Sequence, residues 1–132
     1  DLYREHPDWA LTIPGRNPVH ARNQLVLDFS RKEVVDHIFD QICKVLDQGN
    51  IEYVKWDMNR HMSDAYSPAL SNQGEFAHRY IIGLYEVLDR VFTPRRHILF
   101  ESCSSGGNRF DLGMLCFSPQ IWASTIPIPL SG

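Results

Sequence analysis

The sequence of 132 residues lacks both paired cysteines and an excess of positive charge. Its three cysteines form no CxxC pair, unlike a secreted disulfide framework or a structural zinc site. Thirteen Lys and Arg against sixteen Asp and Glu give a net charge of −3, which argues against a nucleic-acid or anionic-membrane surface. No apolar run approaches the ~20 residues that span a bilayer, and no secretion signal is recognisable. We expect no nucleic-acid partner, no membrane partner and a cytoplasmic location.

The residues that are present make up an ordinary globular composition. Apolar residues account for 43% and charged residues for 22%, which excludes a disordered tail, a collagen-like repeat and a disulfide scaffold. None of the six histidines forms an HxH or HExxH pattern, so we assign no metal. The three tryptophans are candidates for sugar stacking, although core packing is the more frequent use of such residues: Trp9, Trp56 and Trp122.

Strand-length and helix-period segments alternate along the chain. Residues 1–22 are rich in breakers and predict irregular chain. Apolar periodicity predicts strands at residues 24–29, 51–57, 97–101 and 120–123, and helices at residues 30–48, 75–92 and 111–117. Crossovers of this length join parallel strands, so the fold class is α/β, either a barrel or a doubly wound sheet.

The first full helix carries recognisable end signals. Ser30 and Glu33 fit the S-x-x-E capping box, in which each side chain bonds the other residue's backbone amide. Gly49 follows the last apolar position and predicts a left-handed C-cap.

Polar residues follow the second predicted strand, where functional groups of α/β proteins gather. Period-two alternation puts Lys55, Asp57 and Asn59 on one face of that strand. A cation two positions from a carboxylate keeps the carboxylate ionised and suits charge chemistry. A structural Lys–Asp pair at a strand end explains the same pattern.

Glu101 on the third predicted strand has two interpretations. It could share a cleft with Asp57, because glycosidases use two carboxylates, one as nucleophile and one as proton donor. It could equally be a buried structural acid held by Arg60 or Arg109.

The Gly-rich segment at residues 102–108 matches no nucleotide or hydrolase motif well. The Lys of a phosphate-binding loop is absent, and Ser102 stands where the first Gly of G-x-S-x-G belongs. A simpler use of Gly106 is to let the backbone approach a ligand. A hydrolase using Ser104 or Cys103 as nucleophile is a further alternative.

Residues 53–60, YVKWDMNR, resemble the K-W-D-M-N-R motif of the glycoside hydrolase family 36 α-galactosidases, or melibiases. Three more segments resemble that family in the same order, at residues 22–28, 101–107 and 120–124. The resemblance covers residues 1–124 and implies part of a (β/α)8 TIM barrel, about strands 3 to 6. From residue 125 onward nothing resembles the family, and residues 125–132 are predicted to be a non-family tail.

The resemblance also implies an activity and a site. The family consists of retaining enzymes that hydrolyse terminal α-D-galactosyl residues, as in melibiose and raffinose, through a covalent galactosyl intermediate. Asp57 matches the nucleophile, and the implied substrate-binding residues are Arg22, Lys55, Trp56, Met58, Asn59, Cys103 and Gly106. The resemblance implies no cofactor, and a homo-oligomer, a tetramer by family, for the full-length enzyme.

One position departs from the family pattern, and another matches the pattern but conflicts with the predicted strand boundary. Thr125 stands where the family has its acid/base Asp after W-x-S, and a Thr hydroxyl does not titrate near neutral pH. We therefore expect the chain, as a gene fragment or junction product, to be inactive alone; the alternative is a non-catalytic galactoside-binding or scaffold remnant of the same barrel. Arg22 precedes its predicted strand, which would place it at the opposite end of the barrel from the site.

Overall fold

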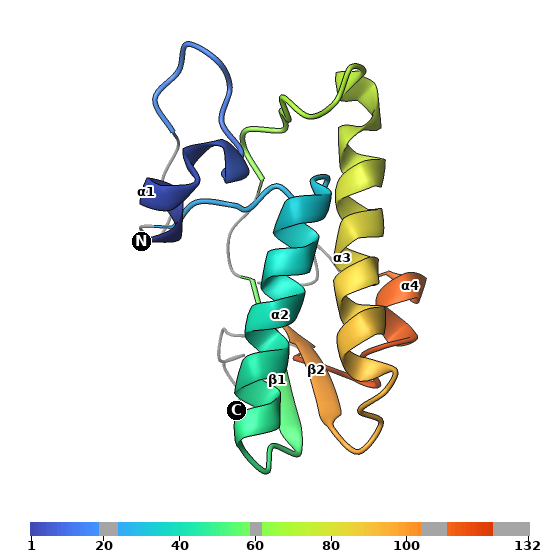
Figure 1. Ribbon diagram of the computed structural model, residues 1–132. Helices are drawn as coiled ribbons and strands as arrows, with labels where there is room; N and C mark the ends of the chain where they lie inside the picture. Colours follow the sequence, from blue (N-terminus) through green and yellow to red (C-terminus); the bar gives the residue numbers. More distant parts are fainter. Residues whose placement is uncertain (19–23, 59–61, 104–110, 123–132) are drawn as a thin grey trace, which may run out of the picture.

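A computed structural model describes residues 1–18, 24–58, 62–103 and 111–122 (Figure 1). Three parallel strands form a sheet in the order β1-β2-β3, with β1 at Tyr53–Asp57, β2 at Leu99–Cys103 and β3 at Gln120–Ile121. Helices α2 (Lys32–Gln48) and α3 (Phe76–Phe92) lie side by side against the sheet (Figure 1). The short helix α4 (Leu112–Leu115) connects β2 to β3. The α/β class with parallel strands is confirmed.

The core lies between the sheet and the two long helices. Helix α3 buries one side of its surface, including Tyr80, Val87, Leu88 and Val91, each 0% exposed. The aromatic rings of Phe92 and Phe100 join α3 to β2, with their centroids 4.5 Å apart. Because fully burying one such side chain stabilises a fold by about 1.5–3 kcal/mol, this helix determines which face of the sheet turns inward. The opposite face remains for polar residues.

The predicted strand at residues 24–29 does not form, and this prediction was wrong. Its backbone forms isolated bridges instead, at Gln24 and, antiparallel to Ala10 of the N-terminal segment, at Leu27. The amide of Leu11 donates to the carbonyl of Val26 at 2.8 Å, and that of Asp28 donates to the carbonyl of Trp9 at 2.8 Å. The described part of the sheet therefore has three strands rather than four.

The N-terminal segment is also more regular than its breakers predict. Helix α1 (Leu2–Glu5) and the 3-10 helix η1 (Pro7–Trp9) occupy a stretch expected to be irregular. Proline stands at the start of η1, where its missing amide costs no hydrogen bond. A second 3-10 turn, η2 (Gln73–Glu75), leads into α3.

Both predicted end signals of α2 are wrong. The helix begins at Lys32, and the Ser30 hydroxyl donates to a carboxylate oxygen of Asp28 at 2.5 Å. Glu33 accepts from the Arg31 guanidinium at 2.9 Å instead of reaching back to the backbone. The buried Asp28 therefore competes successfully for the hydroxyl. Gly49 has φ −137°, which is extended backbone and not a left-handed cap.

The remaining predicted elements are confirmed with small changes of boundary. Helix α3 begins one residue later than predicted, and β1 and β2 each begin two residues later. Within the described residues, no helix has the length and apolar character needed to cross a membrane.

Helix α4 is attached to α3 by a tyrosine–carboxylate contact that should respond to alkaline pH. The Tyr85 hydroxyl donates to Asp111 at 2.5 Å, and Asp111 also accepts from the Met114 amide at 2.9 Å as the N-cap of α4. Burial, together with the bond to Asp111, raises the pKa of Tyr85 to about 12. A group whose pKa is raised on folding contributes stability below its unfolded pKa, about 10, and loses it as the pH rises through the folded value.

We therefore expect wild type to lose, between about pH 10 and pH 12, the stability advantage that it has over Tyr85→Phe. Thermal unfolding followed by circular dichroism across that range measures the difference. One of the five tyrosines should also ionise near pH 12 in an absorbance titration, and Tyr85→Phe should remove that step. A stability difference that stays constant from pH 9 to pH 12 would contradict the assignment.

Candidate active site

Strand β1 presents two different faces, as its alternation predicts. Val54 and Trp56 are half-buried and pack against the core. Tyr53, Lys55 and Asp57 are exposed on the other face, with Asp57 at the carboxyl end of the strand. The exposed Asp57 carboxylate is therefore open to a ligand at the edge of the sheet where α/β enzymes place their sites.

The register brings the second strand's polar residues beside those of β1. Lys55 pairs with Glu101 and Asp57 pairs with Cys103. The two carboxylates, Asp57 and Glu101, thus lie on the same face of adjacent strands. Glu101 is two residues before Cys103, the register partner of Asp57. Glu101 is 2% exposed, whereas Asp57 is exposed, so the two carboxylates meet different environments.

Glu101 is held by neutral donors. One of its oxygens, Oε2, accepts from the Tyr53 hydroxyl and from the Gln120 side-chain amide, the latter at 2.9 Å. Its other oxygen, Oε1, is buried without a hydrogen-bond partner among the described residues. The bond to Glu101 is the main cause that raises the pKa of the Tyr53 hydroxyl above its usual value. This arrangement favours the buried structural acid over the proton donor; the predicted partners Arg60 and Arg109 lie outside the described residues.

The Lys55 side chain reaches across the sheet, from β1 toward β3. Its Nζ lies 4.3 Å from the ring centroid of Trp122, the residue that follows β3. Because β2 stands between β1 and β3, the Lys55 side chain crosses over β2 to make this contact. The residue places a positive charge on the same face as Asp57.

The Melibiase family model matches residues 1–130 of the chain. This chain belongs to the melibiase family. It is 57% identical over 124 residues to the bifunctional alpha-galactosidase/sucrose kinase AgaSK of Mediterraneibacter gnavus, covering 94% of this chain and 13% of that protein. It is 56% identical over 126 residues to alpha-galactosidase AgaA of Geobacillus stearothermophilus, covering 94% of this chain and 17% of AgaA.

Solved structures agree with the sequence comparison. The crystal structure of the GH36 alpha-galactosidase AgaA superposes with a TM-score of 0.88 at 54% identity, over 95% of this chain and 18% of that one. Variants of AgaA have been solved in complex with raffinose and with stachyose. The melibiase chain described here spans less than a fifth of the length of these relatives.

Two predicted substrate-binding residues of this melibiase chain point away from the Asp57 face. Trp56 lies on the core side of β1, with its ring centroid 6.1 Å from that of Phe100. Met58 packs against the core, and its sulfur accepts from the Tyr80 hydroxyl at 3.8 Å. The geometry lends no support to a direct substrate contact from either side chain.

Cys103 pairs in register with Asp57, and its role as a substrate-binding residue stays a prediction. It is 3% exposed, and its carbonyl accepts from the Met58 amide at 2.9 Å, which extends the β1–β2 pairing beyond Asp57. The alternative nucleophile Ser104 lies outside the described residues. So do the predicted site residues Arg22, Asn59 and Gly106, together with Thr125, and their roles stay predictions.

Sequence reasoning did not identify the contacts that organise this face, although it named Trp122 as a candidate for sugar stacking. Tyr53 shares the period-two parity of Lys55 and Asp57, and that parity could have indicated it. Gln120 and Trp122 offered no such signal, because their contacts with Glu101 and Lys55 depend on the β2–β3 register. All three come from the polar face of the sheet.

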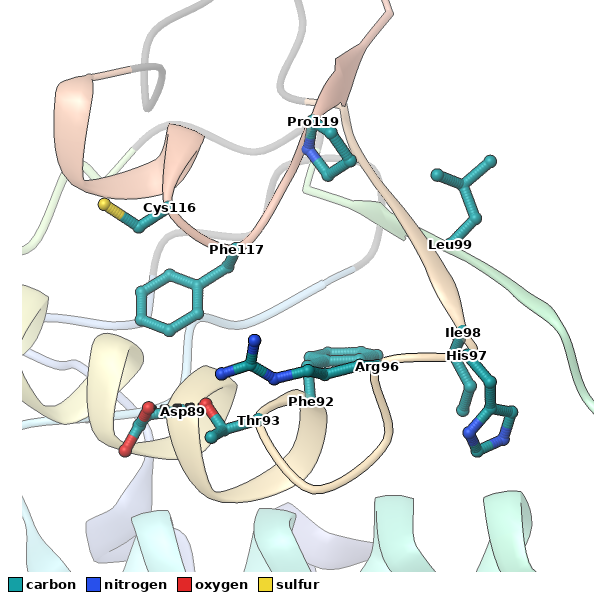
Figure 2. A pocket seen from close by; sticks show the side chains of 10 residues that line it. All are labelled: Asp89, Phe92, Thr93, Arg96, His97, Ile98, Leu99, Cys116, Phe117 and Pro119. Carbon is teal, nitrogen blue, oxygen red and sulfur yellow. Dashed lines mark hydrogen bonds between the residues drawn. The ribbon is translucent and has the colours of Figure 1, made fainter.

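A cavity of about 610 Å³ lies away from this site, at the amino end of β2 (Figure 2). The end of α3, the turn that follows it and the segment after α4 line it, with Phe92, Arg96 and Phe117 among its residues. It faces the opposite end of the strand from Cys103, so we do not assign the reaction to it. Within the described ranges, no group of three or more His, Cys, Asp or Glu side chains is arranged to bind a metal ion.

Proposed function

We propose that this chain is the nucleophile-bearing part of a retaining α-galactosidase that cleaves terminal α-D-galactosyl residues from sugars such as raffinose and melibiose. The observation that carries the proposal is the exposed Asp57 at the carboxyl end of β1, on the same face as Lys55. The similarity of the chain to AgaA, variants of which bind raffinose and stachyose, supports the substrate class.

The Asp57 carboxylate attacks the anomeric carbon of the galactosyl unit and forms a galactosyl ester, while the bond to the leaving sugar breaks. The leaving oxygen takes a proton from a general acid, and water later cleaves the ester with that same group acting as base. Lys55 and Asn59 donate to galactose hydroxyls, and Arg22, Cys103 and Gly106 complete the substrate-binding set. The scheme requires no cofactor.

The larger enzyme is proposed to be a (β/α)8 barrel, to which this chain contributes about strands 3 to 6. The three parallel strands with their crossover helices support a segment of such a barrel, whereas the strand numbers come from the family resemblance alone. We further propose residues 1–124 as the barrel segment and residues 125–132 as a tail, although the family model extends through residue 130. A cytoplasmic location and a homo-oligomeric complete enzyme, a tetramer by family, are part of the same proposal.

Thr125 favours a second candidate function. With Thr at the acid/base position, the chain lacks the proton donor that an unactivated sugar leaving group needs. A galactoside-binding or scaffold remnant would keep the sugar contacts without turnover. The two functions separate when the missing carboxylic acid is supplied.

We expect Thr125→Asp to switch on raffinose cleavage when residues 1–125 replace the matching segment of AgaA. General acid–base catalysis contributes about 10²–10⁴-fold, so the Asp form should exceed the Thr form by that factor. Steady-state release of galactose measures the difference. A nitrophenyl α-galactoside serves as control substrate. Its leaving group needs little protonation, so the initial burst of nitrophenol, which reports formation of the galactosyl ester alone, should show a much smaller difference.

Two results would contradict this part of the proposal. Equal turnover of raffinose by the Thr and Asp forms would show that residue 125 is not the acid/base. Galactose binding by the Asp form without any turnover would favour the non-catalytic remnant.

A further inference from the structure

The contact between Lys55 and Trp122 joins residues from the two outer strands of the sheet. The Nζ atom lies 4.3 Å from the ring centroid, within the roughly 6 Å over which an aromatic face attracts a cation. Tryptophan is the side chain that makes this attraction strongest. The contact therefore constrains a long side chain that would otherwise sample many rotamers.

The backbone around Trp122 is anchored before its ring meets the lysine. Its amide donates to the carbonyl of Ser102 at 3.0 Å, which continues the pairing of β3 with β2. The buried Ser118 hydroxyl accepts from the Ser102 amide at 2.8 Å and donates to the carbonyl of Gln120 at 2.6 Å. These bonds fix the short strand β3, so the ring is presented from a defined position.

Trp122 is 46% exposed and is not part of the apolar core. Core packing, the usual role of a tryptophan, does not account for its place. Stacking on a sugar is the other common role, but the Lys55 ammonium already covers one face of the ring.

A carboxylate, that of Glu101, lies on β2 beside Lys55. Glu101 pairs in register with Lys55, and its Oε1 atom is buried without a hydrogen-bond partner among the described residues. A cation that crosses β2 thus passes a buried carboxylate before it reaches Trp122. Both features favour a single location for the ammonium.

We propose that Trp122 is a positioning residue that holds the Lys55 ammonium on the Asp57 face, aimed at a galactose hydroxyl. The claim that the ammonium meets a galactose hydroxyl (the galactose part) rests on the proposed function. The claim that Trp122 fixes the position of the ammonium (the hold on Lys55) does not. Trp122 acts through Lys55 and does not itself stack on the sugar through the covered face.

Amine labelling of the 132-residue chain tests the hold directly, because the sequence contains only three lysines, Lys32, Lys44 and Lys55. Limiting acetic anhydride at fixed pH, followed by peptide mass analysis, gives the rate at Lys55 relative to Lys44. We expect Trp122→Leu to raise this ratio about two- to fivefold, as an exposed cation–π contact implies, and Trp122→Phe to raise it less. Trp9→Leu is the matched control and should leave it unchanged.

A second measurement needs no variant. The ring current of Trp122 should shift the ε-methylene proton resonances of Lys55 upfield of those of Lys32 and Lys44 in the wild-type chain. Unshifted Lys55 resonances, or a labelling ratio that Trp122→Leu leaves unchanged in a folded chain, would overturn the hold on Lys55.

The galactose part is tested in the AgaA exchange protein, that is, AgaA in which residues 1–125 of this chain replace the matching segment. The probe is 1-deoxygalactonojirimycin, which binds a variant of AgaA. Trp122→Leu should weaken binding of this probe about two- to fivefold, with Trp122→Phe intermediate. Unchanged affinity alongside raised Lys55 labelling would overturn the positioning role. The proposed function would survive that result, because it depends on Asp57.

Discussion

Asp57→Asn should abolish raffinose hydrolysis by the AgaA exchange protein that carries Asp at position 125. An amide cannot form the glycosyl ester, so we expect turnover to fall by about 10⁴-fold or more, in the range seen when an enzyme loses its nucleophile. Galactose release measures the loss. Because Asp57 is exposed and lies at a strand end, the substitution should leave the fold intact.

Two controls make this result specific to the nucleophile. Asp40→Asn removes the same charge from an exposed position on α2 and should leave turnover unchanged. Asp57→Gly with added azide should regain cleavage of a nitrophenyl α-galactoside, since azide attacks the anomeric carbon and yields β-galactosyl azide. Undiminished hydrolysis by Asp57→Asn, or no azide adduct from Asp57→Gly, would refute the role of Asp57.

Gly83→Ala should destabilise the chain by about 3 kcal/mol, although alanine is the better helix former. A β-carbon at this position in α3 would overlap the backbone carbonyl of Phe29 and lie 3.2 Å from a methyl group of Val35. A carbonyl cannot rotate aside as a flexible side chain can, so the helix and the segment before α2 would have to separate. Urea unfolding of the chain measures the loss.

The control for this prediction comes from the same helix. His78→Ala replaces an exposed side chain of α3 and should change the free energy of unfolding by no more than about 0.5 kcal/mol. If Gly83→Ala stabilised the chain by the ~1 kcal/mol that helix propensity alone gives, the close approach of α3 to Phe29 would be wrong.

The sequence predicted the charged residues of the site better than the contacts that hold them in place. Alternation along β1 sufficed to put Lys55 and Asp57 on one face, because the apolar Val54 and Trp56 between them must face the core. The same alternation speaks against substrate contact by Trp56 and Met58, which the motif resemblance implied. Local periodicity and a family motif thus disagreed, and the packing of these two side chains follows the periodicity.

Two of the errors arise because another group, near or far along the chain, takes the hydrogen bond that the local pattern predicts. The Ser30 hydroxyl was expected to cap α2, but the buried Asp28 and the hydroxyl of Ser67 take it. Residues 24–29 have the pattern of a strand, yet the Val26 carbonyl and the Asp28 amide bond the backbone of residues 9–11. A local pattern cannot say which partner, many residues away, offers the better hydrogen bond.

By itself, the sequence determined the order of the elements from α2 onward, the polar face of β1 and the family, because all three depend on local patterns and motifs. Tertiary structure alone decided that Tyr53 and Gln120 hold Glu101, that Lys55 crosses β2 to Trp122, and that Gly83 admits the carbonyl of Phe29. The reason is that these contacts depend on strand register and on the distance between packed elements. Both are set by the packed core as a whole.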